Sequence, residues 1–220
     1  MNGIFADFHT HTLISDGELL PAELVQRTSS SGCKALAITD HVDSSNLEDA
    51  ITRVRRFVEE LGHGWDMEII PGVELTHVPP RRIDALVEKA RSLGAQWIVV
   101  HGETVVEPVA VGTNRAAIEA AVDLLAHPGL ITAEEASKAT NLGVYLEITT
   151  RKGHSLTNGW VAQRAKEAGA LLLINTDTHA PGDIINMEQR EIVALGAGLE
   201  KNEVVQLWEN ASKILARLRD

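Results

Sequence analysis

The sequence contains a single cysteine, Cys33, in 220 residues. One thiol excludes an internal disulfide framework, and we expect Cys33 to be a small buried side chain in a reducing compartment. Long apolar runs are also missing, since the most apolar short stretch, residues 170–174, is far too short to span a bilayer. The first ten residues lack the basic and apolar regions of a secretory signal. These absences predict a cytoplasmic protein without membrane contact.

Positive charge is scarce as well. Lysine and arginine number 20 against 31 aspartates and glutamates, so the formal net charge is −11. Such a chain is a poor general binder of nucleic acid backbone. The four tryptophans are not adjacent to one another and suggest no stacking platform. Small anionic substrates remain compatible with this charge, because bound metal ions change the local sign.

The chain shows no linker, no low-complexity segment and no repeat of fixed period. Its length suits one domain, residues 1–220. Hydrophobic residues make up 44% and charged residues 23%, a composition typical of a globular protein.

Short apolar runs alternate with amphipathic stretches along the chain. The runs predict strands at residues 4–8, 35–39, 68–73, 96–100, 123–126, 144–148 and 171–175. Helical patterns occupy residues 21–31, 47–61, 81–93, 113–121, 132–141 and 159–168, and two more precede residue 218. Continuous apolar strands that are each followed by a helix indicate a parallel α/β sheet. Periodicity alone allows either an open sheet or a closed barrel.

Histidines and carboxylates gather where the predicted strands end. They are His9, His11, Asp16, His41, Glu74, His101, His127, Asp177 and His179. The C-terminal strand ends form the active face of α/β folds. Ligands from six strands converge most easily if those ends form a ring, so we expect a closed, distorted barrel. The mixed nitrogen and oxygen set fits two or three zinc, manganese or iron ions better than calcium.

The succession HxH, TDH, GVE, HG, HP and DTH resembles the PHP superfamily, named for polymerase and histidinol phosphatase domains. The resemblance extends from Asp7 to His179. It implies an α/β fold, a distorted (β/α)7 barrel, with a trinuclear metal centre at the C-terminal ends of the strands. By this resemblance, one ion would bind His9, His11, Glu74 and Asp177, a second Glu74, His101 and His127, and a third Asp16, His41 and His179.

We find no room for a sizeable insertion between these motifs and no attached polymerase domain. The resemblance therefore favours an enzyme similar to the standalone histidinol-phosphate phosphatases. In the predicted reaction, a metal-bridging hydroxide attacks the phosphorus of a small-molecule phosphate monoester. Asp7 and Asp40 lie beside ligands and are candidates to orient imidazoles or, equally, to stabilise local turns. Candidates to bind the phosphate are Arg151 and His154 after the sixth strand, and Arg115 at a helix start.

Three other readings stay open. The same metals could cleave a phosphodiester, as an exonuclease would, although that needs a basic or aromatic strand-binding groove. A metallohydrolase acting on amides or lactams could use similar barrel ligands. A non-catalytic metal-binding regulatory module is the third. The C-terminal helix could cover the barrel or a neighbouring subunit, which leaves the oligomeric state open.

Overall fold

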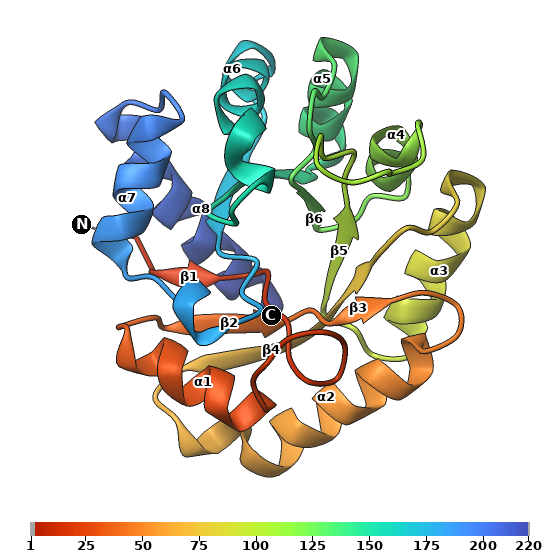
Figure 1. Ribbon diagram of the computed structural model, residues 1–220, viewed down its shortest axis with the longest axis vertical. Helices are drawn as coiled ribbons and strands as arrows, with labels where there is room; N and C mark the ends of the chain where they lie inside the picture. Colours follow the sequence, from red (N-terminus) through yellow and green to blue (C-terminus); the bar gives the residue numbers. More distant parts are fainter. Residues whose placement is uncertain (1–2, 220) are drawn as a thin grey trace.

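The computed structural model describes residues 3–219, in which strands and helices alternate around a central ring (Figure 1). The strands are β1 (Ala6–Asp7), β2 (Ala35–Ile38), β3 (His41–Val42), β4 (Glu68–Leu75), β5 (Trp97–His101), β6 (Leu124–Ala126), β7 (Tyr145–Thr149) and β8 (Leu172–Asn175). The helices are α1 (Pro21–Ser30), α2 (Leu47–Leu61), α3 (Pro80–Ser92), α4 (Thr113–Glu119), α5 (Ala133–Leu142), α6 (Asn158–Ala168), α7 (Met187–Gly196) and α8 (Lys201–Arg219). Short 3-10 turns are η1 (Gly62–Gly64), η2 (His154–Thr157) and η3 (Pro181–Asp183).

All paired strands are parallel, in the order β1-β2-β4-β5-β6-β7-β8. The predicted α/β barrel is thereby confirmed as a parallel sheet that is nearly closed. The predicted strand at residues 35–39 ends one residue earlier in the structure, at Ile38. After a break in the strand, β3 begins at His41 and also pairs with β4. In that pairing His41 lies opposite Glu74. The break therefore brings two predicted ligands side by side.

β1 and β8 meet at the seam of the barrel, where the described residues form no regular ladder of strand hydrogen bonds. One parallel bridge joins Thr10 to Thr178. Farther down, the guanidinium of Arg190 on α7 donates hydrogen bonds to the carbonyls of Ala6 and Ile174, at 2.9 and 3.2 Å. It also pairs with Asp7 at 2.6 Å, and both side chains are almost fully buried. A buried arginine, ion-paired to β1 and hydrogen-bonded to both strands, thus joins the two edge strands of the sheet.

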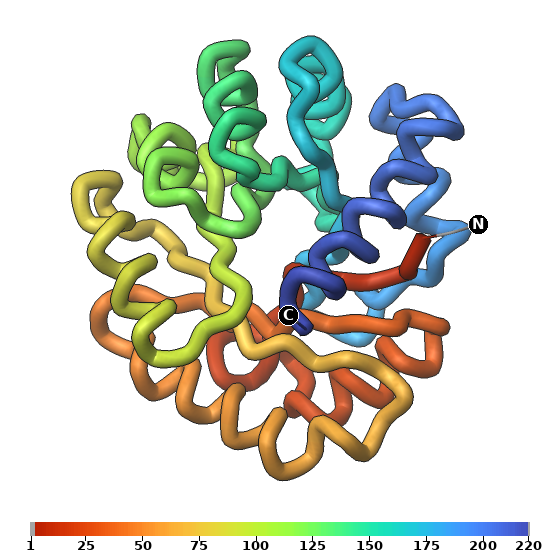
Figure 2. Tube along the Cα trace, turned by 180° about the vertical axis from the view of Figure 1, so that it is seen from behind, coloured from red at the N-terminus to blue at the C-terminus, as the bar shows by residue number. Residues whose placement is uncertain are grey.

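Apolar side chains form two clusters, one on each face of the curved sheet. Inside the barrel, Phe8 packs on Trp97 with ring centroids 5.0 Å apart. Helix α8 adds Ala211, Ile214 and Leu215 to this inner cluster, and it crosses the N-terminal end of the barrel (Figure 2). Burial of these side chains against the strands is favourable at roughly 25 cal/mol per Å² of apolar surface. In this chain the C-terminal helix therefore covers its own barrel.

The outer cluster lies between the sheet and the surrounding helices. Helix α2 shows why: Leu47, Ala50, Ile51 and Val54 recur at helical spacing and are all buried. Cys33 is buried in the same cluster, and burial raises its thiol pKa to about 11. Among residues 3–219, no helix is long and apolar enough to cross a membrane.

Candidate metal centre

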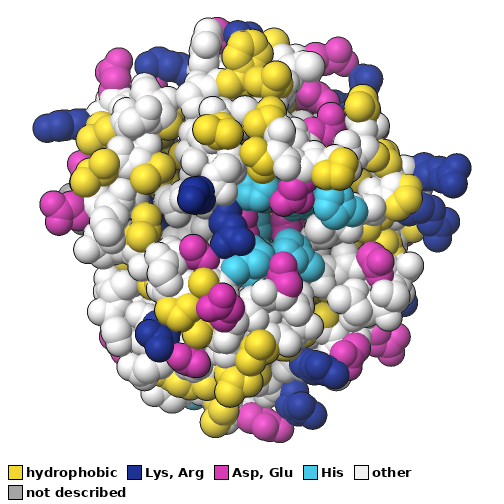
Figure 3. Space-filling view, viewed as in Figure 1, with side chains coloured by type: hydrophobic (Ala, Val, Ile, Leu, Met, Phe, Trp, Pro, Cys, Tyr) yellow, Lys and Arg dark blue, Asp and Glu magenta, His cyan; other side chains and the backbone are white. Residues whose placement is uncertain are grey.

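A cavity of about 430 Å³ opens at the C-terminal ends of the strands. Histidines and carboxylates form its surface, as the hollow at the centre of the molecular face shows (Figure 3). Its lining includes the predicted ligands Asp16, His41, His101, Asp177 and His179. The other four predicted ligands lie beneath them and are buried. The barrel thus brings together side chains that are up to 170 residues apart (from 9 to 179) in the sequence.

Glu74, at the end of β4, lies in the middle of the group. Its Oε1 atom is 3.3 Å from His9 Nε2 and 3.4 Å from His101 Nδ1. Its Oε2 atom is 3.6 Å from His11 Nε2 and 2.7 Å from His41 Nδ1. A single carboxylate therefore faces four imidazoles from three strand ends, the position required of a bridging ligand.

Buried polar atoms at this site lack hydrogen-bond partners. Of twelve such side-chain nitrogen and oxygen atoms in residues 3–219, nine belong to predicted ligands. These ligands are His9, His11, Glu74, His101, His127 and Asp177. Their contacts with one another are close but do not have hydrogen-bond geometry. Since an unpaired buried polar group costs about 1–3 kcal/mol, and such groups in native proteins call for an explanation, the donor set fits divalent metal ions.

The potential ligand atoms form overlapping groups within which every atom lies within 4.8 Å of the others. The groups are His11–Asp16–His41–His179, His9–His127–Asp177, His9–His11–Glu74, Glu74–His101–His127 and His77–His101–Glu107. The fourth coincides with the set that the resemblance implied for a second ion. The first contains the set implied for a third ion, with His11 added. The fifth, at the mouth of the cavity, was not anticipated from the sequence.

Burial and neighbouring charge set the protonation of the site. Burial and the imidazole of His41 hold the pKa of His11 well below its usual value. Burial and His101 act in the same way on the pKa of His127. Burial raises the pKa of Asp177 to about 7. Neutral imidazoles are the form that binds metals, whereas a carboxyl must lose its proton.

Two predicted ligands have strained backbone. His127 and Asp177 have positive φ angles of 26° and 51°, and His77 at the mouth has 52°. Non-glycine residues in this region cost of the order of 1–3 kcal/mol and occur preferentially at functional sites. Next to His101, Gly102 permits a close approach, because a Cβ there would lie 2.3 Å from the Ala126 carbonyl oxygen.

Two carboxylates of this site were missed from the sequence. Glu147 in β7 is fully buried, and its Oε1 lies 2.9 Å from His9 Nδ1. Its position inside the apolar run of the sixth predicted strand was the available signal, since a buried charge requires a partner. Glu107 follows β5, with Oε2 3.0 Å from His101 Nε2 and 3.4 Å from His77 Nε2. Nothing in the spacing around Glu107 distinguished it from a solvated loop residue.

Neither Asp7 nor Asp40 contacts an imidazole. Asp7 pairs with Arg190 and accepts hydrogen bonds from the hydroxyl and backbone N–H of Thr176. Asp40 accepts from the backbone and hydroxyl groups of Thr12 and Ser15, at 2.7–3.1 Å. Asp40 stabilises a turn, although one that lies 25–28 residues away in the sequence, whereas Asp7 joins distant segments of the chain. Asp40 in particular holds the loop that carries Asp16.

The predicted phosphate-binding residues separate into two places. Arg151 and His154 line the histidine-rich cavity, and Arg151 pairs with Asp183 at 2.8 Å. Arg115 lies elsewhere, in a groove between the loops after β5 and β6, and pairs with Glu119 and Glu134. The structure thus removes Arg115 from the candidate substrate site.

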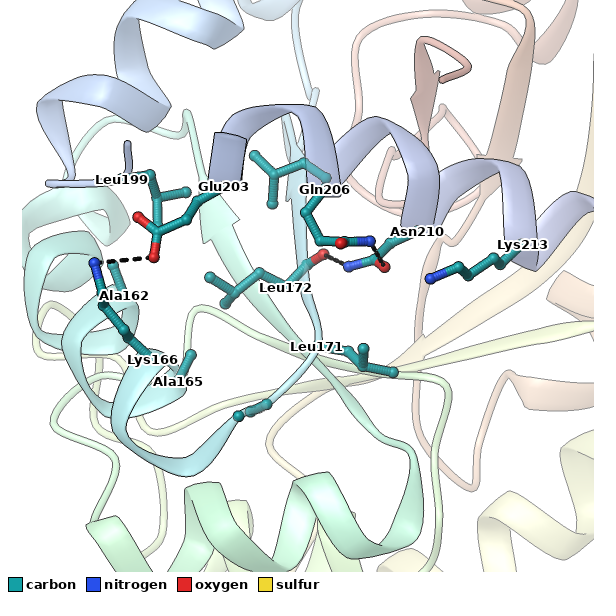
Figure 4. Close-up of a pocket in the computed structure, with 13 residues that line it drawn as sticks. Ala162, Ala165, Lys166, Leu171, Leu172, Leu199, Glu203, Gln206, Asn210 and Lys213 are labelled. Carbon is teal, nitrogen blue, oxygen red and sulfur yellow. Dashed lines mark hydrogen bonds and ion pairs between the residues drawn. The ribbon is translucent and has the colours of Figure 1, made fainter. Parts of the chain in front are cut away.

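A second cavity, of about 370 Å³, lies between α6, β8 and α8 (Figure 4). Its wall is largely apolar, with Ala162, Ala165 and Leu199 among the lining residues. Lys166 pairs with Glu203 at 3.0 Å along its edge. None of the predicted metal ligands lines this cavity, so we place the functional site at the strand ends.

Several known proteins are similar to this chain in sequence or in fold. An uncharacterised protein of Methanocaldococcus jannaschii is 52% identical over 200 residues, covering 90% of this chain and 92% of its own. The 5'-3' exoribonuclease Rnm of Escherichia coli is 36% identical over 75 residues, 34% of this chain and 24% of its own. The fold is similar to that of histidinol phosphate phosphatase from Lactococcus lactis, whose structure contains zinc, L-histidinol and phosphate. That match has a TM-score of 0.61 and 16% identity, and covers 89% of this chain and 94% of that chain.

The PHP domain family model matches residues 7–179. This range begins at the HxH strand and ends at His179, so it contains all nine predicted ligands. The chain therefore belongs to the PHP domain family.

Proposed function

We propose that this PHP-family phosphoesterase hydrolyses small phosphate monoesters, as the histidinol phosphate phosphatases with a similar fold do. The observation that carries the proposal is the cluster of buried, unpaired imidazole and carboxylate atoms at the cavity that Arg151 also lines. Divalent ions bound there would supply positive charge for phosphate oxygens and would lower the pKa of the attacking water.

The nine ligands would hold up to three ions. Glu74 faces both the His9–His11 pair and the His101–His127 pair, so it is suited to bridge two of them. Asp16, His41 and His179 would hold the third ion, with Asp40 keeping the Asp16 loop in place. Zinc, manganese and iron all suit this mixture of imidazole and carboxylate ligands.

Arg151 would bind the phosphate from the wall of the cavity. Asp183 Oδ2 accepts from its guanidinium at 2.8 Å, and also from the backbone N–H groups of His179 and Ala180. The guanidinium is therefore held next to a predicted metal ligand. Its remaining N–H groups can bind phosphate oxygens in the two-point manner typical of arginine.

The experiment is phosphate release from a panel of phosphomonoesters that includes histidinol phosphate. Metal-free protein is reconstituted with manganese, zinc or iron, and a monoester chromogen is compared with a diester chromogen. We expect metal-dependent release from monoesters and much slower cleavage of the diester. Absence of release with every ion, despite bound metal, would overturn the proposal.

A second candidate function is exonuclease activity, which the partial match to the Rnm exoribonucleases favours. Against it, Arg151 is the only lysine or arginine among the described residues that line the cavity. A single-strand groove needs several cations or aromatic rings. Degradation of a 5'-phosphorylated oligoribonucleotide at a rate exceeding monoester turnover would move the assignment to this function.

A further inference from the structure

Glu147 is a buried carboxylate outside every predicted metal-ligand group. It lies in β7, between the strands that carry His127 and Asn175, and it is 0% exposed. Its ion-pair partner among the described residues is His9, and no lysine or arginine reaches it. Since burying a charge without partners is very costly, the three contacts that Glu147 makes explain its presence.

The first contact determines how His9 faces the site. Glu147 Oε1 lies 2.9 Å from His9 Nδ1, and Asn175 Nδ2 donates to the same oxygen at 3.0 Å. A carboxylate accepts hydrogen bonds, so it keeps the ring proton on Nδ1. Nε2, which lies 3.3 Å from Glu74 Oε1, is then left with its lone pair available for a metal ion.

The other oxygen of Glu147 holds a second predicted ligand. Oε2 accepts a hydrogen bond from the backbone N–H of His127 at 3.0 Å. His127 has a strained φ of 26°, and its Nε2 lies 3.8 Å from both Glu74 and Asp177. A fixed backbone N–H is a simple means of maintaining that conformation.

We propose that Glu147 is a positioning residue that aligns His9 and His127 together for metal binding. His9 belongs to the group implied for the first ion and His127 to that implied for the second, so one carboxylate serves both. Carboxylates that hold the second nitrogen of a metal-bound histidine typically contribute 10- to 100-fold in metal affinity. The proposal rests on the metal assignment of the proposed function, but not on the identity of the substrate.

Zinc affinity of full-length variants tests the proposal, measured by competition with a chelating dye. We expect Glu147→Ala to weaken binding by about 10- to 100-fold. Glu147→Gln should weaken zinc binding by a smaller factor, because its carbonyl oxygen can still accept a hydrogen bond from His9. Its amide group would face the His127 N–H, so that second hydrogen bond is lost. The matched control is Glu103→Gln, since the Glu103 carboxylate likewise accepts backbone N–H hydrogen bonds, from Gly112 and Asn114, and is bonded to no predicted ligand among the described residues.

A second measurement does not depend on affinity. In zinc-loaded protein, the His9 Nδ1 proton should give a slowly exchanging downfield NMR signal, which Glu147→Ala abolishes. This distinguishes alignment of the ring from a general loss of packing. If Glu147→Ala does not fold, the Gln variant must shift the same signal, because its amide is a weaker acceptor.

The proposal is overturned if folded Glu147→Ala binds zinc as tightly as the parent, or if Glu103→Gln weakens binding to the same extent. It is also overturned if the His9 signal survives the substitution. These outcomes are distinct from failure of the proposed function, in which the parent binds metal but releases no phosphate.

Discussion

Two cavities of similar volume differ in how their polar atoms are satisfied. The cavity at the strand ends measures about 430 Å³ and the cavity beside α8 about 370 Å³. In the second, Asn210 donates to the Leu172 carbonyl and accepts from Gln206, and Lys166 pairs with Glu203 (Figure 4). In the first, buried imidazole and carboxylate atoms lack partners and the backbone is strained.

This difference shows that volume does not identify a functional site. Evolution of a stable fold alone would remove unpaired buried polar atoms, because each lowers stability. Their persistence at the strand ends indicates that a ligand completes them. If so, matched substitutions in and away from the strand-end region should have different effects.

Asp177→Ala should reduce phosphate release by about 10³-fold or more, because metal-ion catalysis contributes several kcal/mol to lowering the barrier. Gln206→Ala, in the cavity beside α8, should leave turnover unchanged. Steady-state rates on a monoester chromogen with saturating metal compare the two. An equal loss of turnover in both variants would contradict the assignment of the functional site to the strand-end cavity.

Two ion pairs, one buried between β1 and α7 and one exposed beside α8, should differ in their effect on stability. Arg190→Met leaves Asp7 charged and buried without its partner, so unfolding free energy should fall by about 3–5 kcal/mol. Lys166→Met removes an exposed partner from Glu203, and its urea midpoint should match that of the parent. Urea unfolding of metal-free protein measures both. A small effect of Arg190→Met would show that the seam closes without it.

Arg151 and its neighbour Lys152 provide a contrast within a single loop. Arg151 lines the strand-end cavity, whereas Lys152 is exposed and does not. Arg151→Ala should lower kcat/KM by about 10- to 100-fold, the value of a charged hydrogen bond. Lys152→Ala removes the same charge and should have little effect at moderate ionic strength. Similar losses would instead indicate general electrostatic attraction.

A further contrast concerns the pH dependence of stability in the metal-free protein. Burial holds the pKa of folded Asp177 at about 7, above the ordinary 3.8, so the folded state binds this proton more tightly. The stability that this carboxyl contributes is therefore present below 3.8 and is lost as pH rises towards 7. Asp177→Asn should raise the Tm of metal-free protein near neutral pH, and less in acid. A constant difference across the range would contradict this assignment.

Much of the site could be predicted because local sequence carries the signal. HxH and DTH follow apolar runs, and alternation along a strand places His9 and His11 on one side. Their ligand atoms do approach the same carboxylate, Glu74. The roles of Asp7 and Asp40 were harder to predict, because adjacency to a ligand in the sequence does not show which way a side chain points.

Other residues could not be assigned without the fold. Arg190 occurs in a helix pattern as one more charge, yet it is 1% exposed and joins β1 to β8. Glu107 and His77 come from different loops and meet only because the ends of β4 and β5 are neighbours. Arg115 had the same local features as a phosphate ligand but faces another groove.

We could predict from the sequence alone the alternation of strands and helices, the parallel α/β class and the residues able to bind metal. These depend on periodicity and on side-chain chemistry, which are local properties. The fold was needed to show that Glu74 lies among the other ligands, that Glu147 contacts Nδ1 of His9, and that Arg190 joins β1 to β8. Such contacts join residues far apart in the chain, and their geometry follows from barrel curvature and strand register, which no short segment specifies.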